Sequence, residues 1–237
     1  MKKKFIIIIP ARKGSQRFPE KNHKRLGGKN LLKLKLKQCM HKKFGDVVVT
    51  SDDKKILESA RKLGVKYIRE RPEKVAGDIS TTNVVYDAVK FYEKATKSEI
   101  DFFILSQLTS PFISQKDFKK TMEFFCNNEK FNSLIACKSD NFKRFFWFFF
   151  EDKAKNFFNI SEKLQKQVEK FTNNKKAYIP NGGIYIIRRN KLKKTGKLYT
   201  GPVKVWPMNK FASLDIDYEE DLVLANYYIK KKLIMIN

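Results

Sequence analysis

Two stretches of the sequence combine side chains that could bind a nucleotide and a metal ion. The first, PARKGSQRFPEKN, holds Arg12, Arg17 and Lys21, whose positive charges could neutralise a triphosphate. Gly14 and Ser15 in the same stretch favour a tight turn with exposed backbone N–H groups. The spacing matches neither the P-loop nor the dinucleotide-binding fingerprint. A phosphate-binding loop and a merely basic surface loop therefore both remain open.

The second stretch, SLDIDYEEDL, lies near the C-terminus and carries a pair of carboxylates. In an extended segment the side chains of Asp215 and Asp217 fall on one face. Two carboxylates this close could hold Mg²⁺, with water and phosphate oxygens completing the coordination shell. The alternative is that these acids cap the final helix. A basic loop and a carboxylate pair in one chain together favour metal-assisted nucleotide chemistry.

The elements that must position these residues follow an alternating pattern. Short apolar runs alternate with amphipathic stretches, which predicts βα units and a mostly parallel α/β sheet covered on both faces. The expected strands span residues 5–9, 46–50, 66–68, 102–105, 133–137 and 183–187. The basic loop directly follows the first of these strands. Open sheets of this class bind ligands at the carboxyl ends of their strands, so its position suits a binding site.

Helices are expected between the strands. Apolar residues at helical spacing predict helices around residues 56–63, 85–92 and 118–125, and the last helix follows the acidic start DYEED. The stretch LLKLKLKQCM is ambiguous, because its period-two alternation suits a strand while Leu32, Leu36 and Cys39 suit a helix. We favour a helix, since it would complete the first βα unit.

The alternation breaks down between about 138 and 179. This span mixes aromatic residues with a polar helical stretch, and it includes the run RFFWFFF. We interpret it as an insertion within a single domain of residues 1–237. Its exposed aromatic residues would need cover, most simply from a second subunit, so a homodimer is expected.

Composition limits the classes of protein that need consideration. Hydrophobic residues make up 42% of the 237, which is typical of a globular chain. The formal net charge of +26 raises the alternative of a nucleic-acid-binding protein, but the lysines are dispersed along the chain and favour a solvated surface. Three cysteines without metal-ligand spacing fit a reducing cytoplasm. The N-terminal apolar run is shorter than the roughly 7–15 residues of an export signal, and no membrane span is expected.

Six motifs in order resemble those of the sugar-acid cytidylyltransferases. They are IIPARKGSQRFPEKNHKRLGGKNLL, VVVTSDD, RERPEKVAGDISTTNVV, LSQLTSP, NGGIYII and SLDIDYEEDL. The resemblance is strongest to the branch of CMP-N-acylneuraminate (CMP-sialic acid) synthetases, including legionaminate and pseudaminate relatives. It implies a Rossmann-like α/β nucleotidyltransferase that activates a nonulosonic acid with CTP. The sugar's anomeric hydroxyl would attack the α-phosphorus in line, with Mg²⁺ assistance and release of pyrophosphate.

The resemblance also implies roles for particular residues. Cations that contact the triphosphate are Arg12 and Lys21, and further nucleotide contacts are Ser15, Asn22, Arg71 and Thr82. The Mg²⁺ ligands are Asp215 and Asp217, which with Arg12 and Lys21 form the catalytic set. The sugar pocket is lined by Gln107, Asn181, Tyr185 and Tyr199. From the residues alone, Tyr185 could equally belong to the core of its strand.

The sequence departs from the family pattern at several positions. Lys13 stands where glycine is common, Arg17 and Phe18 replace a glycine-aliphatic pair, and Leu108 replaces a proline. A basic Arg-Gln element expected about ten residues before Asn181 is missing. These departures leave the acceptor open: it is a sialic, legionaminic or pseudaminic acid or Kdo. They also leave GTP open as an alternative to CTP.

Overall fold

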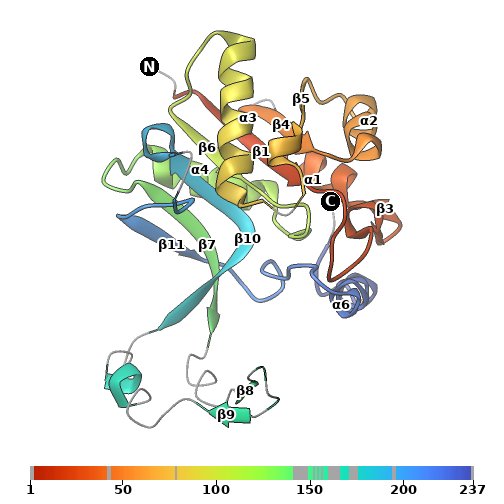
Figure 1. Ribbon diagram of the computed structural model, residues 1–237, viewed down its shortest axis with the longest axis vertical. Coiled ribbons are helices and arrows are strands. Elements are labelled where there is room, and N and C mark those ends of the chain that lie inside the picture. Colours follow the sequence, from red (N-terminus) through yellow and green to blue (C-terminus); the bar gives the residue numbers. More distant parts are fainter. Residues whose placement is uncertain are drawn as a thin grey trace.

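The computed structural model describes residues 3–41, 44–77, 79–140, 149–151, 153, 155, 157–159, 166–170, 176–193 and 196–235. Seven strands of this described part form one twisted sheet, in the order β11-β7-β10-β6-β1-β4-β5 (Figure 1). In that order, from one edge of the sheet to the other, they are β11 (Val203–Pro207), β7 (Ser133–Asp140), β10 (Ala177–Arg188), β6 (Phe102–Leu105), β1 (Phe5–Ala11), β4 (Asp46–Ser51) and β5 (Tyr67–Glu70).

The sheet is mostly parallel, as the sequence predicts. β1 pairs in parallel with β4 and β6, β4 pairs in parallel with β5, and β11 pairs in parallel with β7. β10 alone among these strands runs antiparallel to both of its neighbours. All six expected strands are present, and the sequence analysis missed β11. The apolar run of β1 places Ile6 to Ile9 in the interior, where none of the four is exposed.

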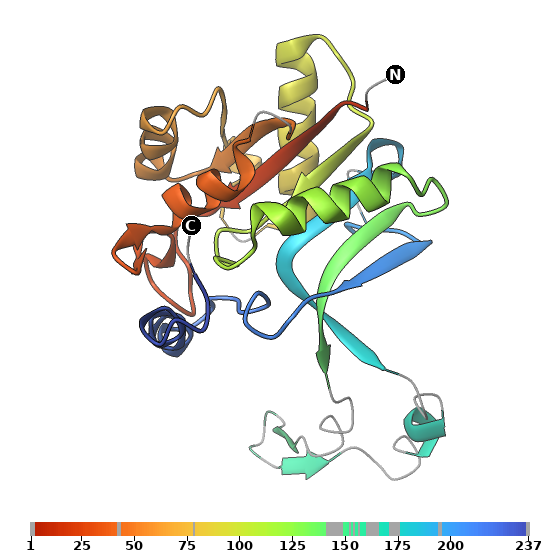
Figure 2. The same ribbon diagram turned by 180° about the vertical axis from the view of Figure 1, so that it is seen from behind.

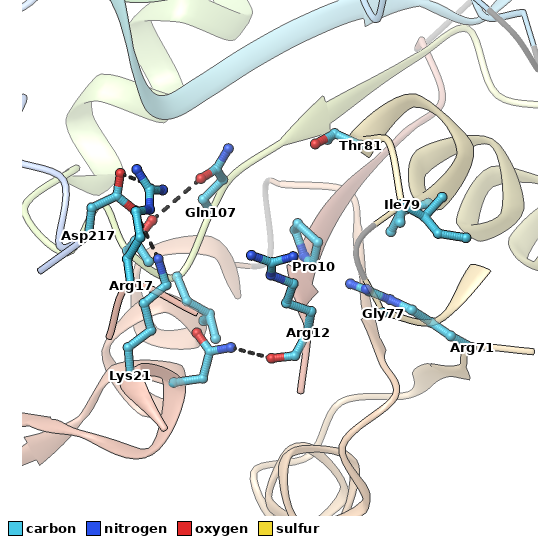
Figure 3. Close-up of a pocket in the computed structure, with 14 residues that line it drawn as sticks. Pro10, Arg12, Arg17, Lys21, Arg71, Gly77, Ile79, Thr81, Gln107 and Asp217 are labelled. Carbon is cyan, nitrogen blue, oxygen red and sulfur yellow. Dashed lines mark hydrogen bonds and ion pairs between the residues drawn. The ribbon is translucent and has the colours of Figure 1, made fainter. Parts of the chain in front are cut away.

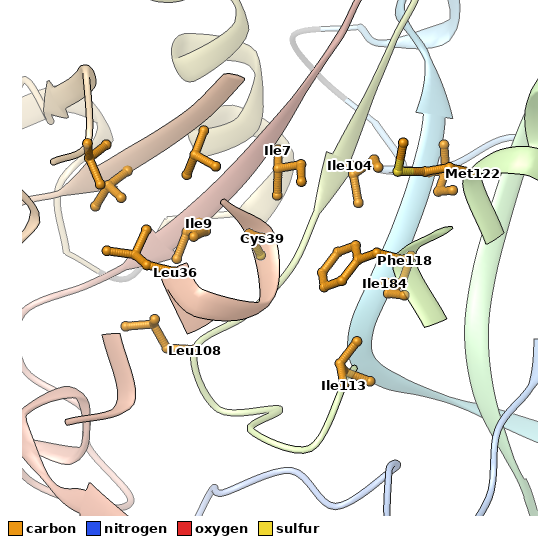
Figure 4. Close-up of a cluster of buried hydrophobic side chains, with 14 of the residues drawn as sticks. Ile7, Ile9, Leu36, Cys39, Ile104, Leu108, Ile113, Phe118, Met122 and Ile184 are labelled. Carbon is orange, nitrogen blue, oxygen red and sulfur yellow. The ribbon is translucent and has the colours of Figure 1, made fainter. Parts of the chain in front are cut away.

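Helices cover both faces of the sheet. α1 (Leu31–Cys39), α2 (Lys54–Lys62) and α4 (Gln115–Cys126) pack with alternate strand residues into one core (Figures 2 and 4). α3 (Thr81–Thr96) buries Val85, Ala88 and Val89 against the other face. The period of α1 now has an explanation. Leu32 and Leu36 face the sheet, while Leu31 and Leu34 pack toward the C-terminal helix α6 (Glu219–Lys230).

Each of these helices begins where a polar side chain can cap it. The Asn30 side chain accepts from Leu32 N and Lys33 N at the start of α1, which confirms the helix predicted there. Asp53 caps α2 and Ser80 caps α3 in the same way, and Ser114 forms a capping box at α4. The caps fix where the chain leaves each strand end, and therefore where the intervening loops lie.

The described chain also contains smaller elements, besides the helical residues 166–170. They are the hairpins β2 (Arg25–Leu26) with β3 (Lys29–Asn30) and β8 (Phe149–Glu151) with β9 (Phe157–Asn159), and the 3₁₀ turns η1 (Lys21–His23), η2 (Glu73–Val75) and η4 (Arg189–Lys191). No helix in the described residues is both long and apolar enough to cross a bilayer.

The outer ends of β7 and β10 form an arm that leaves the main body. Their pairing continues to Asp140 and Ala177, and Figure 1 shows both strands leading away from the sheet toward β8 and β9. Most of the predicted insertion at 138–179, including residues 144–148 of the aromatic run, lies outside the described residues. Its role in dimerisation stays a prediction.

Candidate active site

Polar residues follow the carboxyl ends of four neighbouring parallel strands. Arg12 follows β1, Asp52 follows β4, Arg71 follows β5 and Gln107 comes shortly after β6. Of these, Arg12, Arg71 and Gln107 line a cavity of about 300 Å³ (Figure 3). Its wall is formed by Pro10, Arg12, Arg17, Lys21, Asn22, Arg71, Gly77, Ile79, Thr81, Val84, Gln107, Leu108, Thr109 and Asp217. The basic stretch near the N-terminus is therefore a wall of a cavity and not merely surface.

Asp217 lies at one end of this cavity, between two cations. Lys21 Nζ is 2.9 Å from Oδ1, and Arg17 Nη2 is 2.9 Å from Oδ2 (Figure 3). The Arg17 guanidinium also lies over the Tyr218 ring, 5.4 Å from its centroid. A hydrogen bond with Tyr218 and the charge of Asp217 raise the pKa of Arg17. Both carboxylate oxygens thus have a positive partner within the chain, Lys21 for one and Arg17 for the other.

The loop between β1 and η1 is held from two sides. Asn22, which is buried, donates from Nδ2 to Arg12 O at 2.9 Å. Asp52 accepts from Lys13 N at 2.6 Å and from Gly77 N at 3.0 Å, so it joins this loop to the segment before α3. Sequence reasoning gave Asp52 no role. Its place directly after an apolar strand was the one available signal.

Arg71 and Thr82 lie at the other end of the cavity. Arg71 is buried, and it donates from Nη2 to Thr50 O at 3.2 Å. Burial lowers the pKa of its guanidinium. The buried Thr82 donates its hydroxyl to Gly196 O at 3.3 Å, while its neighbours Ile79 and Thr81 line the wall. In this structure Thr82 contributes to the shape of this end rather than to the lining.

A second cavity of about 540 Å³ lies on the opposite side of the basic loop. Ser15 lines it together with Lys13, Gly14 and the start of α2, and Arg12, Lys21 and Asn22 border both cavities. Gly14 has φ +70°, a left-handed conformation that glycine adopts without strain, so the tight turn expected at Gly14 and Ser15 is present. The loop therefore presents cations to two adjoining spaces.

Asp215 lines a third cavity, of about 910 Å³, together with Asn181 and Asp217. Its Oδ1 is buried without a hydrogen-bond partner in the structure. Burial raises the pKa of Asp215 and the charge of Asp217 adds to this effect, while a Thr109 hydrogen bond and the charges of Lys21 and Lys35 oppose it. A shielded carboxylate oxygen without a donor beside a second carboxylate is the kind of donor set that a hard divalent cation takes.

The residues Asn181 to Gly183 form a bulge that brings β10 up to this carboxylate. Gly182 has φ +73°, and a Cβ placed on it would lie 3.0 Å from Asp215 Oδ2. Gly182 O accepts from Gln107 N at 3.2 Å, and Asn181 Nδ2 donates to Ser213 Oγ at 3.0 Å. The bulge thus gathers Gln107, Asn181 and Asp215, three residues that lie far apart in the sequence.

Tyr185 and Tyr199 lie on the α3 side of the sheet. Both are half-buried and pack against the core cluster that contains Val85 and Val89. Burial raises the pKa of Tyr185 to about 12, and the charge of Asp215 adds to the shift. Tyr185 is thus part of its strand's packing and also within electrostatic reach of the site. A role in sugar binding for either tyrosine stays a prediction.

Comparison with known proteins assigns the family. Residues 6–233 match the family model described as Cytidylyltransferase. The chain belongs to the cytidylyltransferase family. This makes it a nucleotidyltransferase, and it confirms the resemblance seen in the sequence motifs. No group of three or more potential His, Cys, Asp or Glu metal ligands occurs in the part of the chain that the structure describes. The carboxylate pair is therefore the donor set to consider for a cation.

Individual cytidylyltransferases share modest identity with this chain. The CMP-N,N'-diacetyllegionaminic acid synthase of Legionella pneumophila is 27% identical over 226 residues, which cover 94% of each chain. The N-acylneuraminate cytidylyltransferase of Escherichia coli O18:K1:H7 is 28% identical over 98% of this chain and 54% of its own length.

A solved CMP:2-keto-3-deoxy-manno-octonic acid synthetase complexed with CTP superposes with TM-score 0.64 over 97% of this chain and 99% of its own, at 17% identity. A 4-diphosphocytidyl-2C-methyl-D-erythritol synthase superposes with TM-score 0.65 at 11% identity. At these identities the likeness concerns the fold alone. It confirms the expected Rossmann-like α/β architecture.

Proposed function

We propose that this cytidylyltransferase transfers CMP from CTP to a nonulosonic acid, giving the CMP-sugar and pyrophosphate. The observation that supports the proposal is that the carboxylates of Asp215 and Asp217 lie beside a cation-lined cavity, which is at the carboxyl ends of parallel strands. The names of the relatives, a CMP-N,N'-diacetyllegionaminic acid synthase and an N-acylneuraminate cytidylyltransferase, support the choice of acceptor. We also propose a cytoplasmic location for the reaction, as the absence of metal-ligand spacing among the three cysteines suggests.

The cations of the basic loop are suited to a triphosphate. Arg12, Arg17 and Lys21 converge on one cavity, with the backbone of the loop fixed by Asn22. In-line attack on the α-phosphorus concentrates negative charge on phosphate oxygens, and fixed positive groups stabilise that charge. The end near Arg71 and Thr82 is left for the nucleoside. Ser15 on the far side of the loop would contact the phosphates through the second cavity.

Asp215 and Asp217 are the residues that would hold Mg²⁺. The unpartnered Oδ1 of Asp215 fits this role, and a magnesium site commonly uses one or two carboxylates with phosphate and water oxygens. The ion would supply charge neutralisation at the transferred phosphoryl group. Lys21 and Arg17, which neutralise Asp217 in the substrate-free chain, would then be released to contact the phosphates.

The acceptor is expected in the third cavity, on the side of Gln107 and Asn181. Asn181 lines that cavity and is fixed by Ser213, while Tyr185 and Tyr199 would complete the sugar pocket. Lys138 and Ile179 at the base of the arm line the same space. We propose that a second copy of the chain covers this region in a homodimer, with the arm at the interface.

The test is pyrophosphate release with a panel of sugar acids. The panel comprises N-acetylneuraminic, legionaminic and pseudaminic acids and Kdo, each with CTP or GTP and with or without Mg²⁺. We expect release only when CTP, Mg²⁺ and a nonulosonic acid are all present, and a product of CMP-sugar mass. Pyrophosphate release with Kdo and with none of the other acids would assign Kdo as the acceptor. Folded protein that turns over none of the acids would refute the proposal.

A further inference from the structure

A buried lysine lies beneath the site. Lys35 on α1 is 1% exposed, whereas Lys33 and Lys37 on the same helix are exposed. A buried ammonium group costs free energy unless hydrogen bonds and an opposite charge compensate it. None of the roles described above uses this side chain. Its position requires an explanation from its surroundings.

The Lys35 ammonium joins two segments of the site floor. Nζ donates to Ser106 Oγ at 3.2 Å and to Ser110 O at 2.8 Å. These residues stand at the two ends of the turn that follows β6 and that contains Gln107 and Thr109. One side chain on α1 therefore fixes both ends of that turn.

The same hydrogen bonds continue into the bulge of β10. Ser106 Oγ donates to Gly183 O at 2.7 Å, and Ser110 Oγ donates to Asn181 O at 3.1 Å. Lys35 is thus connected through Ser106 and Ser110 to both ends of the segment that places Asn181. Buried networks of this kind hold a single geometry when every member has a partner.

The charge of Lys35 also interacts with an opposite charge, that of Asp215. Burial lowers the pKa of Lys35 to about 8, and the charge of Asp215 acts in the opposite direction. Reciprocally, the charge of Lys35 lowers the pKa of Asp215. A lysine protonated at neutral pH and a half-buried carboxylate without a donor on Oδ1 therefore compensate each other across the floor.

We propose that Lys35 is a positioning residue for the acceptor half of the site. It holds the turn after β6 and the Asn181–Gly183 bulge together through Ser106 and Ser110, and so places Gln107 and Asn181 for the sugar acid. This inference rests on the proposed function. The turn also supplies Gln107 and its neighbours to the wall of the first cavity. The walls of that cavity at Arg12 and Arg71 are held by other contacts, because Asn22 fixes the loop at Arg12 and Thr50 accepts from Arg71.

The experiment compares Lys35→Met with Lys33→Met. Methionine keeps an unbranched side chain in the packed interior but removes the charge and the donor. Each variant is characterised by its CTP dissociation constant from calorimetry and by kcat and KM for the best acid of the panel. For Lys35→Met we expect kcat/KM for the acid to fall roughly 10- to 100-fold, as small misplacements of positioning groups do. The CTP dissociation constant should stay within about twofold, and Lys33→Met should match the wild type.

A second variant protects the test against a folding failure. Ser106→Ala keeps the lysine but removes the hydroxyl between it and Gly183. We expect an acceptor-specific loss in the same direction. Hydrogen exchange gives a readout independent of turnover, since the amides of Gln107 and Gly183 donate to Gly182 O and Asn181 Oδ1. Both should exchange faster in Lys35→Met, with the segment around Arg12 unchanged.

Three results would overturn the inference. They are wild-type kinetics for the acid in Lys35→Met and Ser106→Ala, an equal weakening of CTP binding, and the same loss in Lys33→Met. Failure of the proposed function is distinguishable, because the wild type would then show no turnover with any acid. In that case the exchange measurement still tests whether Lys35 holds the turn and the bulge together.

Discussion

Asp217 shows how one residue can serve two states of a site. In the substrate-free chain Lys21 and Arg17 each lie 2.9 Å from one of its oxygens. Together with Arg12, the same two cations are candidates to contact a triphosphate. Binding of nucleotide and of a divalent cation would therefore exchange partners among groups already present.

This arrangement predicts opposite effects of Asp217→Asn on binding and on turnover. We expect turnover with Mg²⁺ to fall at least about 100-fold, because the proposed metal ligand is lost. CTP measured in EDTA should bind more tightly than in the wild type, since Lys21 and Arg17 lose their internal counter-charge. Calorimetry in EDTA and a pyrophosphate assay check both parts, with the exposed Glu219→Gln as control. Weaker metal-free CTP binding in Asp217→Asn would contradict the role given to the ion pairs.

The burial of Lys35 also predicts how the free energy of unfolding depends on pH. Its pKa is about 8 in the folded chain and 10.5 in its ordinary state. Between these values the unfolded chain binds more protons, so this residue's contribution to the free energy of unfolding rises with pH. The stability of the wild type relative to Lys35→Met should therefore increase from about pH 8 to about pH 10. Urea unfolding across this range measures it, and a flat difference, as expected for wild type against Lys33→Met, would contradict it.

At the residue scale, sequence reasoning found groups whose chemistry is visible in their type and spacing. Arg12 and Lys21, expected in a loop at the carboxyl end of the first strand, line one cavity together with Asp217. Lys35 could not be found in this way. It stands in a lysine-rich helix where the neighbouring lysines, Lys33 and Lys37, are exposed. Its hydrogen bonds are to Ser106 and Ser110, which only the tertiary structure brings near.

At the scale of elements, β10 is the strand on which the site depends. It runs antiparallel in an otherwise parallel sheet, and its bulge places Asn181 and Gly182 against Ser110 and Asp215. A parallel strand would reach this edge of the sheet only at its carboxyl end. An antiparallel strand instead passes through the site and can contribute backbone and side chains along its length.

Gly182→Ala should damage both folding and activity. A residue with a Cβ pays about 1–2 kcal/mol for the left-handed conformation, and this Cβ would lie 2.8 Å from Ser110 Oγ and 3.0 Å from Asp215 Oδ2. Overpacking of this kind costs a further 1–3 kcal/mol or so. Gly64→Ala is the matched control, because Gly64 has φ +82° with open space around it. The free energy of unfolding, measured in urea, and the turnover rate should both be lower in Gly182→Ala than in Gly64→Ala. Equal losses in the two variants would show that the close contacts of the added Cβ do not matter.

The elements were predictable where apolar runs are long and unbroken. β1, β4, β6 and β7 follow that rule. The outer half of β10 was missed because its sequence, AYIPNGG, contains a proline and two glycines that indicate a turn. β11 was missed since VKVWP is short and mixes lysine with apolar residues, and it is a strand through its pairing with β7.

At the scale of the whole molecule, we expect the chain to form a homodimer. The exposed side chains of Ile179 on the arm and of Leu224 on α6 line the third cavity, and Tyr227 and Val223 extend the apolar surface on that helix. Such a surface is unusual for a monomer. Light scattering at micromolar concentration should therefore give twice the chain mass of 27.9 kDa. A stable mass of one chain would remove the second subunit from the proposed acceptor site.

The bulge in β10 also bears on how such a chain can change in evolution. From Pro180 to Tyr185 the strand advances five residues while its partner β7 advances two, from Cys137 to Ile135. The extra residues are accommodated locally, so the inner half of β10 keeps its own alignment with β6. Insertions or deletions in the arm can then be absorbed before they reach the sheet. Changes of length in the arm would therefore leave the pairing of β10 with β6 in place.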